Sequence, residues 1–247
     1  MRQFIDICEA ESEIRRDVYK GTKVTSSRVQ QSTNLNINGR ERINYSYSIL
    51  DTTRYGTISE IVDFGRQRGF QIYQETTIRD WLEREITHRV NPDAFKDPSI
   101  FTEKYHPALK QTFEGNSPSY TYTERLHGAV DFLAHELSSH PDSRRAYWPI
   151  FDQRDARRAY LPTRVPCSLG YQVMIRQVGS HPQLMLFYLQ RSCDFDTFWL
   201  SDIWLAMRFQ EAIYGKLLKH YDDLLLGQFV HIILSLHSFK VENEEIY

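Results

Sequence analysis

The stretch Arg164-Val165-Pro166-Cys167-Ser168 is followed along the chain by Gln190-Arg191-Ser192-Cys193-Asp194. A cysteine reacts as its thiolate, which nearby positive charge and hydrogen-bond donors stabilise. Arg164 and Arg191 could supply that charge to Cys167, and an arginine beside a serine suits a phosphate group. These residues predict a thiol beside an anion site. The alternative is that Cys167 is a buried apolar side chain, the usual fate of a free cysteine.

The segments around these two stretches show strand and helix patterns. Residue types and periodicity predict strands at 145–151, 169–178 and 183–190, a long helix at about 202–220 and an apolar, β-compatible segment at 228–239. Earlier in the chain we predict helices at 5–19, 76–88 and 124–139, and strands around a hairpin within 22–50, with Gly39 in a turn. The prolines of 89–119 indicate a loop-rich region. We therefore expect one α+β domain over residues 1–247.

The composition is that of an ordinary globular protein. The chain has 247 residues, of which 41% are hydrophobic and 25% charged. Its net charge of −2 gives no general attraction to nucleic acid or membranes, so any anion site must be local. Three cysteines without metal-ligand spacing predict neither a disulfide scaffold nor a metal site. We find neither an apolar leader nor an apolar run long enough to span a membrane, so we expect a cytoplasmic protein with reduced cysteines.

Taken together, these motifs resemble the thymidylate synthase superfamily, and within it the phage deoxycytidylate (dCMP) hydroxymethylases. The resemblance runs from about Tyr120 to Phe239 and is thin before that. It rests on Ser143-Arg144-Arg145, Pro166-Cys167, Gln172, Gln190-Arg191-Ser192-x-Asp194 and Phe229-Val230-His231…His237-x-Phe239. It implies an α+β fold with a central mixed sheet packed by helices, and a homodimer formed through one face of that sheet.

The resemblance gives roles to the thiol and the phosphate ligands. In the family, the cysteine after proline adds to C-6 of the pyrimidine, and Cys167 is similar to it. Arg191 would hold the nucleotide phosphate beside the thiol, with Ser192 on the same phosphate. Arg144 and Arg145 would reach the phosphate of the neighbouring subunit, which implies sites shared across the dimer.

Four further residues resemble family positions around the base and the folate. Asp194 would meet the pterin ring of folate and its ordered waters. Gln190 and Gln172 match buried polar positions that support the site. Tyr120 resembles the tyrosine whose hydroxyl assists proton removal from C-5.

Two family features have less definite counterparts in this sequence. The catalytic glutamate, expected on a helix, matches Glu85, with Glu83 as the alternative. The N-terminal phosphate arginine has no arginine in register, and Lys20, Lys23 or Arg28 could replace it.

Asp202 stands where thymidylate synthases read the uracil edge with an asparagine, and where the resembling hydroxymethylases have aspartate. A carboxylate accepts a hydrogen bond from the 4-amino group of cytosine, and from N-3 once that nitrogen is protonated. A buried polar group left unpaired by the wrong substrate discriminates on the order of 10⁴-fold. Asp202 therefore indicates a cytosine nucleotide. Its alternative or additional role is to cap the helix that follows, because aspartate is a favoured N-cap residue.

Several departures from the family pattern concern the sugar and the folate. The family's final His-x-Tyr, which binds the sugar 3′-hydroxyl, is His237-Ser238-Phe239 here, so a ribonucleotide such as CMP stays open. The family's glycine-rich loop is replaced by 195–200, which reshapes the folate side. The chain continues only briefly after Phe239, and a shorter closing tail favours hydration of the one-carbon unit over its reduction.

The leading hypothesis is a folate-dependent hydroxymethylase that acts on C-5 of a cytosine nucleotide, with dCMP ahead of CMP. Its one-carbon donor would be 5,10-methylenetetrahydrofolate, and no metal is expected. The nearest alternative is a methylase or hydroxymethylase of dUMP. A non-catalytic homologue that binds a nucleotide or a partner protein is a second class. A hydrolase pairing Cys167 with His231 or His237 is a third, although no oxyanion motif accompanies it.

Overall fold

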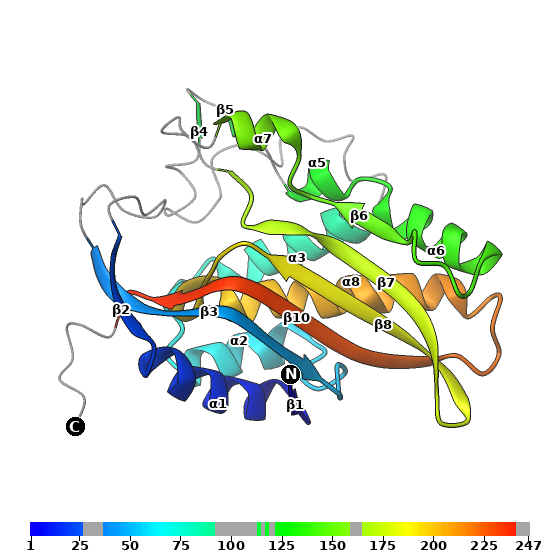
Figure 1. Ribbon diagram of the computed structural model, residues 1–247, viewed down its shortest axis with the longest axis horizontal. Helices are drawn as coiled ribbons and strands as arrows, with labels where there is room; N and C mark the ends of the chain where they lie inside the picture. Colours follow the sequence, from blue (N-terminus) through cyan, green and yellow to red (C-terminus); the bar gives the residue numbers. More distant parts are fainter. Residues whose placement is uncertain (27–36, 92–112, 115–116, 119–121, 159–164, 241–247) are drawn as a thin grey trace.

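The computed structural model describes residues 1–26, 37–91, 113–114, 117–118, 122–158 and 165–240, and has an α+β fold built on an open mixed eight-stranded sheet (Figure 1). The main strands lie in the order β1 (Arg2–Phe4), β3 (Ile37–Ile49), β10 (Leu225–Ser238), β8 (His181–Gln190), β7 (Ser168–Val178) and β6 (Tyr147–Pro149). Two short strands, β2 (Thr22–Ser26) and β9 (Cys193–Asp194), pair with β3 and β10. A separate small hairpin joins β4 (Phe113–Glu114) and β5 (Ser117–Pro118).

The strand directions place the two sequence stretches side by side. β7 and β8 run antiparallel and pair Ser168 with Gln190, so the residues just outside that pair are neighbours. β10 runs parallel to β8 and antiparallel to β3. The end of β8 therefore lies between the start of β7 and the middle of β10.

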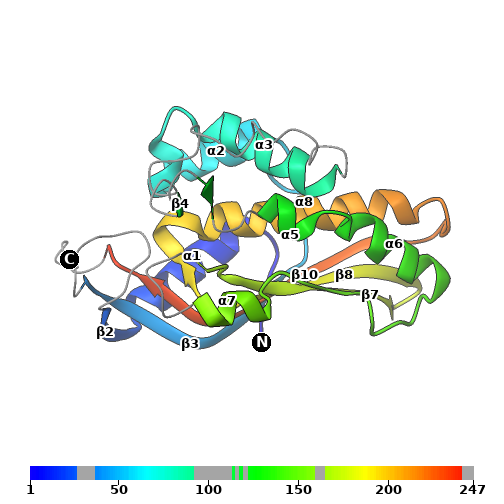
Figure 2. The ribbon, with the colours of Figure 1, turned by 90° about the horizontal axis from the view of Figure 1, so that it is seen from above.

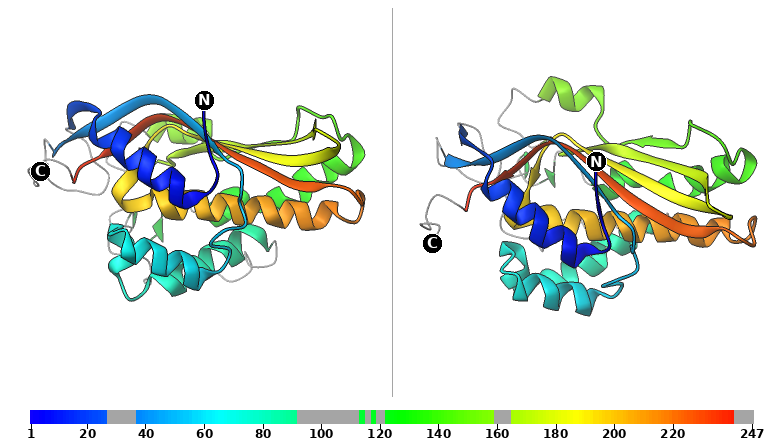
Figure 3. Two further views of the ribbon diagram at one scale, coloured as in Figure 1. Left: turned by 90° about the horizontal axis from the view of Figure 1, so that it is seen from below. Right: turned by 60° about the horizontal axis from the view of Figure 1, so that its bottom comes forward.

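Six of the described helices form two layers on one side of the sheet, and the short helix α7 lies outside both layers (Figures 2 and 3). The inner layer holds α1 (Ile7–Tyr19) and α8 (Leu200–Leu217), with α6 (Ala129–Ser139) beside α8. The outer layer holds α2 (Ile58–Gln67) and α3 (Ile78–Val90), and α5 (Tyr122–Leu126) packs against α3. Short turns at η1 (Gln71–Gln74), η4 (Phe195–Trp199, of π type) and α7 (Gln153–Arg158) complete the described elements.

Local sequence explains where the N-terminal helices begin. Asp6 caps α1 by accepting from the backbone N–H groups of Cys8 and Glu9. Thr57 and Glu60 form a reciprocal capping box at the start of α2. The buried positions of α1, which include Ile7, Ala10, Ile14 and Val18, recur at helical spacing. These caps and this stripe set α1 and α2 against the core.

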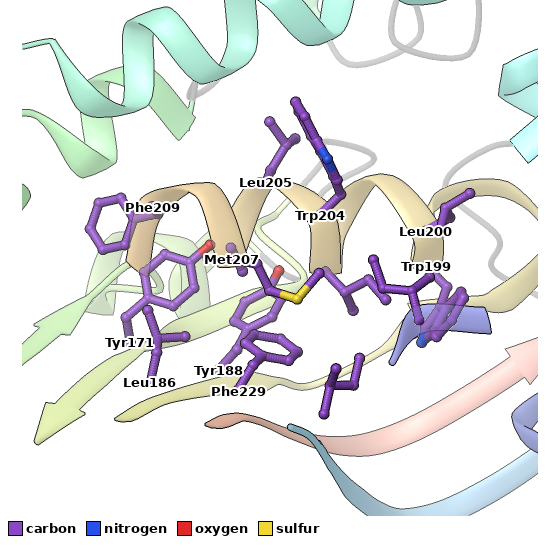
Figure 4. Packing of buried hydrophobic residues seen from close by; sticks show 14 of the residues in the cluster. Tyr171, Leu186, Tyr188, Trp199, Leu200, Trp204, Leu205, Met207, Phe209 and Phe229 are labelled. Atoms are coloured by element: carbon purple, nitrogen blue, oxygen red, sulfur yellow. The ribbon is translucent and has the colours of Figure 1, made fainter. Parts of the chain in front are cut away.

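The core lies between the sheet and α8 (Figure 4). Tyr171, Tyr188 and Phe229 reach up from the strands to Met207 and Phe209 of α8, with the Tyr171 and Phe209 rings stacked 4.9 Å apart. Trp204 points the opposite way, towards the outer helices, and its Nε1–H donates to the carbonyl of Tyr55 at 2.8 Å. α8 is therefore covered on both sides, which explains why apolar residues surround it.

Most predicted elements are confirmed, two expectations are wrong in detail, and one helix was not predicted. The strands expected at 169–178 and 183–190 correspond to β7 and β8, and the helix expected at about 202–220 is α8. The helix expected at 124–139 is instead two helices, because Gly128 has a left-handed backbone with φ of 75°. Gly39 lies within β3 rather than in a turn, and a Cβ there would come 2.5 Å from the carbonyl oxygen of Ser238. α2 was not expected.

Within the described residues, none of the helices combines the length and the apolar character needed to span a lipid bilayer.

Candidate active site

The thiol of Cys167 lies at the start of β7, next to the C-terminal end of β8. Cys167 is half-buried, and its carbonyl oxygen accepts from the backbone N–H of Arg191 at 2.8 Å. Arg191 follows directly after Gln190, the last residue of β8. The antiparallel pairing of β7 and β8 therefore brings the two motifs of the sequence together.

The Arg191 guanidinium is fixed by the loop that carries the thiol. Its Nε and Nη2 donate to the carbonyl oxygens of Pro166 and Val165, at 2.9 and 3.1 Å. Nη2 lies 3.9 Å from the Cys167 sulfur, and the Ser192 hydroxyl lies 3.5 Å from it. A cation and a hydroxyl donor next to the sulfur stabilise a thiolate, so this environment suits a nucleophile better than an apolar packing residue. Arg164, the other predicted cation, lies outside the described residues.

Gln190 points to the other side of β8, into the core, and is fully buried. Its Nε2 donates to the Asp202 carboxylate and to the Tyr188 hydroxyl, both at 2.8 Å. Its Oε1 accepts from His231 Nε2 at 2.8 Å. Gln190 therefore orients the carboxylate predicted to read the base. Asp202 is half-buried in the first turn of α8, which begins at Leu200, so the alternative that Asp202 is the N-cap residue is wrong.

The hydrogen bonds beyond Gln190 determine the tautomer of His231. An amide oxygen can only accept, so Nε2 of His231 carries the hydrogen and Nδ1 accepts from the Tyr47 hydroxyl at 2.7 Å. Tyr47 in turn accepts from Trp199 Nε1 at 2.8 Å. Burial lowers the pKa of His231 to about 3, which is consistent with a neutral ring.

A second branch leads from Gln190 back to the thiol loop. The Tyr188 hydroxyl lies 2.5 Å from the Ser168 hydroxyl, and Ser168 donates to the Tyr122 hydroxyl at 3.3 Å. Ser168 is the residue next to Cys167 in the chain, so this branch ends with the Tyr122 phenol bonded to the residue that follows the thiol. Tyr120, predicted for proton removal, lies outside the described residues. Tyr122 was not considered from the sequence, although it is the second tyrosine of the same Tyr-Thr-Tyr segment.

Glu85 is a buried acid on α3, whereas the alternative, Glu83, is exposed. The Glu85 carboxylate pairs with Arg89 one turn later, with Oε2 2.9 Å from Nη2 and 3.0 Å from Nε. A glutamate held in the interior by a cation is not a solvated helical acid. Sequence reasoning did not single out Arg89, because an arginine on a polar helix gives no signal of burial.

Asp194 begins the η4 turn and is 9% exposed. Its carboxylate accepts from the backbone N–H of Thr197 at 3.3 Å. Burial raises the pKa of Asp194 to about 7. A buried carboxylate of this kind gains from further hydrogen-bond donors, which the N–H groups of a pterin ring would offer.

His237 lies beside Asp194, because β10 and β9 pair these two residues. The His237 ring is half-buried, and its centroid lies 4.8 Å from that of Phe239. Burial lowers the pKa of His237 to about 4, so the ring is neutral near pH 7. A neutral imidazole is better suited to hydrogen-bonding a sugar hydroxyl than to binding an anion.

The remaining predicted residues lie away from the thiol within one chain. Arg144 and Arg145 are exposed on the turn between α6 and β6, which Ser143 stabilises by accepting from the backbone N–H of Arg145 at 3.0 Å. Gln172 pairs with Phe187 across β7 and β8, on the face opposite buried Tyr188 and Gln190. Its amide donates to the Ala146 carbonyl at 3.0 Å.

The N-terminal basic candidates do not converge on one position. Lys20 is exposed at the end of α1, Lys23 is exposed on β2, and Arg28 lies outside the described residues.

Within the part of the chain that the structure describes, no group of three or more His, Cys, Asp and Glu side chains could hold a metal ion. No family model matches this chain, and no curated protein sequence matches it either.

Proposed function

We propose that the protein is a folate-dependent enzyme that hydroxymethylates C-5 of a cytosine nucleotide, with dCMP ahead of CMP as substrate. One observation carries this proposal: the tripeptide Gln190-Arg191-Ser192 contacts both the thiol and the acid of the site. Arg191 and Ser192 reach the Cys167 thiol, while Gln190 holds the Asp202 carboxylate on the other side of β8. A reactive thiol and a base-reading acid at a fixed relative position are what chemistry on a pyrimidine ring requires.

The nucleophilic step would use the environment of Cys167. The thiolate sulfur adds to C-6 of the pyrimidine, and the ring electrons make C-5 nucleophilic. The nucleotide phosphate would lie beside Arg191 and Ser192, which already line the thiol. Arg144 and Arg145 make no hydrogen bond or ion pair with other described residues through their guanidinium groups, so they are available to a phosphate on a second subunit.

The base would be read by Asp202. Its carboxylate accepts from the 4-amino group of cytosine, and from N-3 when that nitrogen carries a proton. Gln190 already donates to Oδ2 of this carboxylate, which limits its rotation. A uracil ring would bring its O-4 acceptor against the same carboxylate, and two facing acceptors repel.

The one-carbon donor would bind on the Asp194 side. When bound, 5,10-methylenetetrahydrofolate supplies a carbon at the oxidation level of formaldehyde. Asp194 would accept from the ring N–H groups of the pterin, a role that fits its buried position without a cation in direct contact.

The atoms of the proposed reaction balance without a further reactant besides water. C-5 gains a bond to the one-carbon unit and then loses its proton to a base, for which the Tyr122 phenol beside Ser168 is the candidate. The bond between that carbon and the folate nitrogen would then break, with tetrahydrofolate as the leaving group. Water adds its hydroxyl to the new exocyclic carbon, and the Cys167 sulfur leaves C-6 as the thiolate. The products are a 5-hydroxymethyl nucleotide and tetrahydrofolate.

A homodimer through the open face of the sheet belongs to this proposal. The face away from the helices carries half-buried apolar side chains outside the core cluster: Met174, Met185, Phe187, Leu189 and Ile232. Contiguous exposed apolar surface marks an interaction site. A second copy of the chain is the proposed occupant, since it would also bring Arg144 and Arg145 to the neighbouring site.

The proposal is tested by incubating dCMP, CMP and dUMP with methylenetetrahydrofolate and identifying the products by mass spectrometry. We expect hydroxymethylated dCMP from the wild type. Cys167→Ala should lose turnover on the order of 10⁴-fold or more while still binding dCMP, and Cys8→Ala should keep it. A uracil product instead would refute the role of Asp202, and no product from any nucleotide would refute the proposed activity.

A further inference from the structure

Arg89 is the one lysine or arginine with a buried side chain among the residues that the structure describes. It lies in the last turn of α3 and is 5% exposed. Removing a guanidinium from water costs several kcal/mol unless partners compensate it, so such a position requires a reason. Its partner is the Glu85 carboxylate, which it contacts through both Nε and Nη2.

The other neighbours of Arg89 belong to the candidate active site. Its guanidinium carbon lies 4.8 Å from the centroid of the Tyr122 ring. It hydrogen-bonds with Tyr171 and is attracted electrostatically to Asp202. Burial lowers the pKa of Arg89, but the Glu85 carboxylate more than offsets this, so the group stays charged.

We propose that Arg89 is a positioning residue of the active site, which holds the Glu85 carboxylate and the Tyr122 phenol in place and balances the charge of Glu85. This inference rests on the proposed function.

A purely structural ion pair would behave differently. Replacing both partners of a buried pair by apolar residues is often neutral or stabilising. If the pair were purely structural, the double variant Glu85→Leu/Arg89→Met would therefore keep its turnover. A positioning pair could not, because the acid and the phenol would lose their fixed places even in a stable protein.

The test compares Arg89→Met and Arg89→Lys with Arg84→Met, which removes an exposed arginine from the same helix. For Arg89→Met we expect kcat on dCMP to fall about 10²-fold or more, the size of a lost general acid or base, with KM changed less. Arg89→Lys keeps the charge but not the planar fork, so kcat should fall about tenfold. Arg84→Met should stay within about twofold of the wild type.

Thermal unfolding and circular dichroism identify variants that do not fold. A folded Arg89→Met or apolar double variant with kcat within about threefold of the wild type would overturn the inference. If Arg89→Met does not fold, Arg89→Lys decides, and a wild-type kcat for Arg89→Lys would overturn the inference. A wild type without turnover on any pyrimidine nucleotide refutes the proposed function itself, which is a separate result.

Discussion

Replacing Gln190 tests the buried hydrogen-bond network most directly. Gln190→Met is close in size and removes all three bonds of the side chain, each 2.8 Å long. His231 Nε2–H then has no acceptor and the Asp202 carboxylate loses a donor. An unsatisfied buried group costs about 1–3 kcal/mol, so the unpaired N–H of His231 predicts a loss of about 1–3 kcal/mol in the free energy of unfolding.

Gln190→Glu separates the donor role from the acceptor role of the same side chain. The introduced carboxyl group still accepts from His231, but when ionised it faces Asp202 as a like charge. When protonated, it can donate to Asp202 as the amide did. Its pKa in the folded protein is therefore raised above the unfolded value, so its stabilising contribution is present at low pH and is lost as the pH rises. Relative to the wild type, Gln190→Glu should be more stable at pH 5 than at pH 8.

Urea unfolding at pH 5 and pH 8, followed by tryptophan fluorescence, measures both effects, because Trp199 and Trp204 are buried in the core. Protein concentration must be held constant, since association shifts apparent stability. Gln177→Met, at an exposed position of β7, is the control and should stay within about 0.5 kcal/mol of the wild type. A loss below about 0.5 kcal/mol for Gln190→Met would refute the network as described.

Two further predictions concern pH and association. Burial lowers the pKa of His231 to about 3, below its unfolded value, so the stability that it contributes is present above about pH 6.5 and lost as the pH falls towards 3. Between pH 6.5 and 5 the free energy of unfolding should fall by about 2 kcal/mol because of His231. His231→Asn should remove this fall from the pH dependence measured by urea unfolding. An unchanged pH dependence in His231→Asn would contradict the prediction. Ile232→Glu, on the open face of the sheet, should convert a dimer to a monomer in light scattering. Leu218→Glu, at the exposed residue that follows α8, should leave the dimer intact, and a wild type that is already monomeric would contradict the interface.

Local sequence was sufficient to predict the helices and strands that have a regular apolar pattern. The apolar stripe of α1 and the period-two pattern of β7 and β8 reflect burial of one face, and burial is what sets periodicity. α2 has a capping box and a buried stripe too, yet its short pattern was not recognised. The break at Gly128 depends on a single left-handed residue, which a helical pattern does not reveal.

The thiol end of the site was predictable because its parts are close in sequence. Cys167, Arg191 and Ser192 meet through the antiparallel pairing of the two strands that the sequence predicts at 169–178 and 183–190. The hydrogen bonds that continue from Gln190 to His231 and then to Tyr47 were not predictable, because His231 and Tyr47 come from strands that join only in the assembled sheet. Arg89 escaped notice for the same reason: its burial depends on Tyr122, which a different segment supplies.

The chain of bonds from Trp199 to Asp202 has only one possible direction. An indole N–H can only donate and a carboxylate can only accept, so every hydroxyl, imidazole and amide between them is fixed in a single orientation. Turning the Gln190 amide over would break bonds along the whole chain at once. Asp202 is therefore preorganised: its conformational entropy is lost during folding, and a ligand meets an acceptor that needs no reorientation. Recognition at this position should then act by selection among bases, with little induced fit.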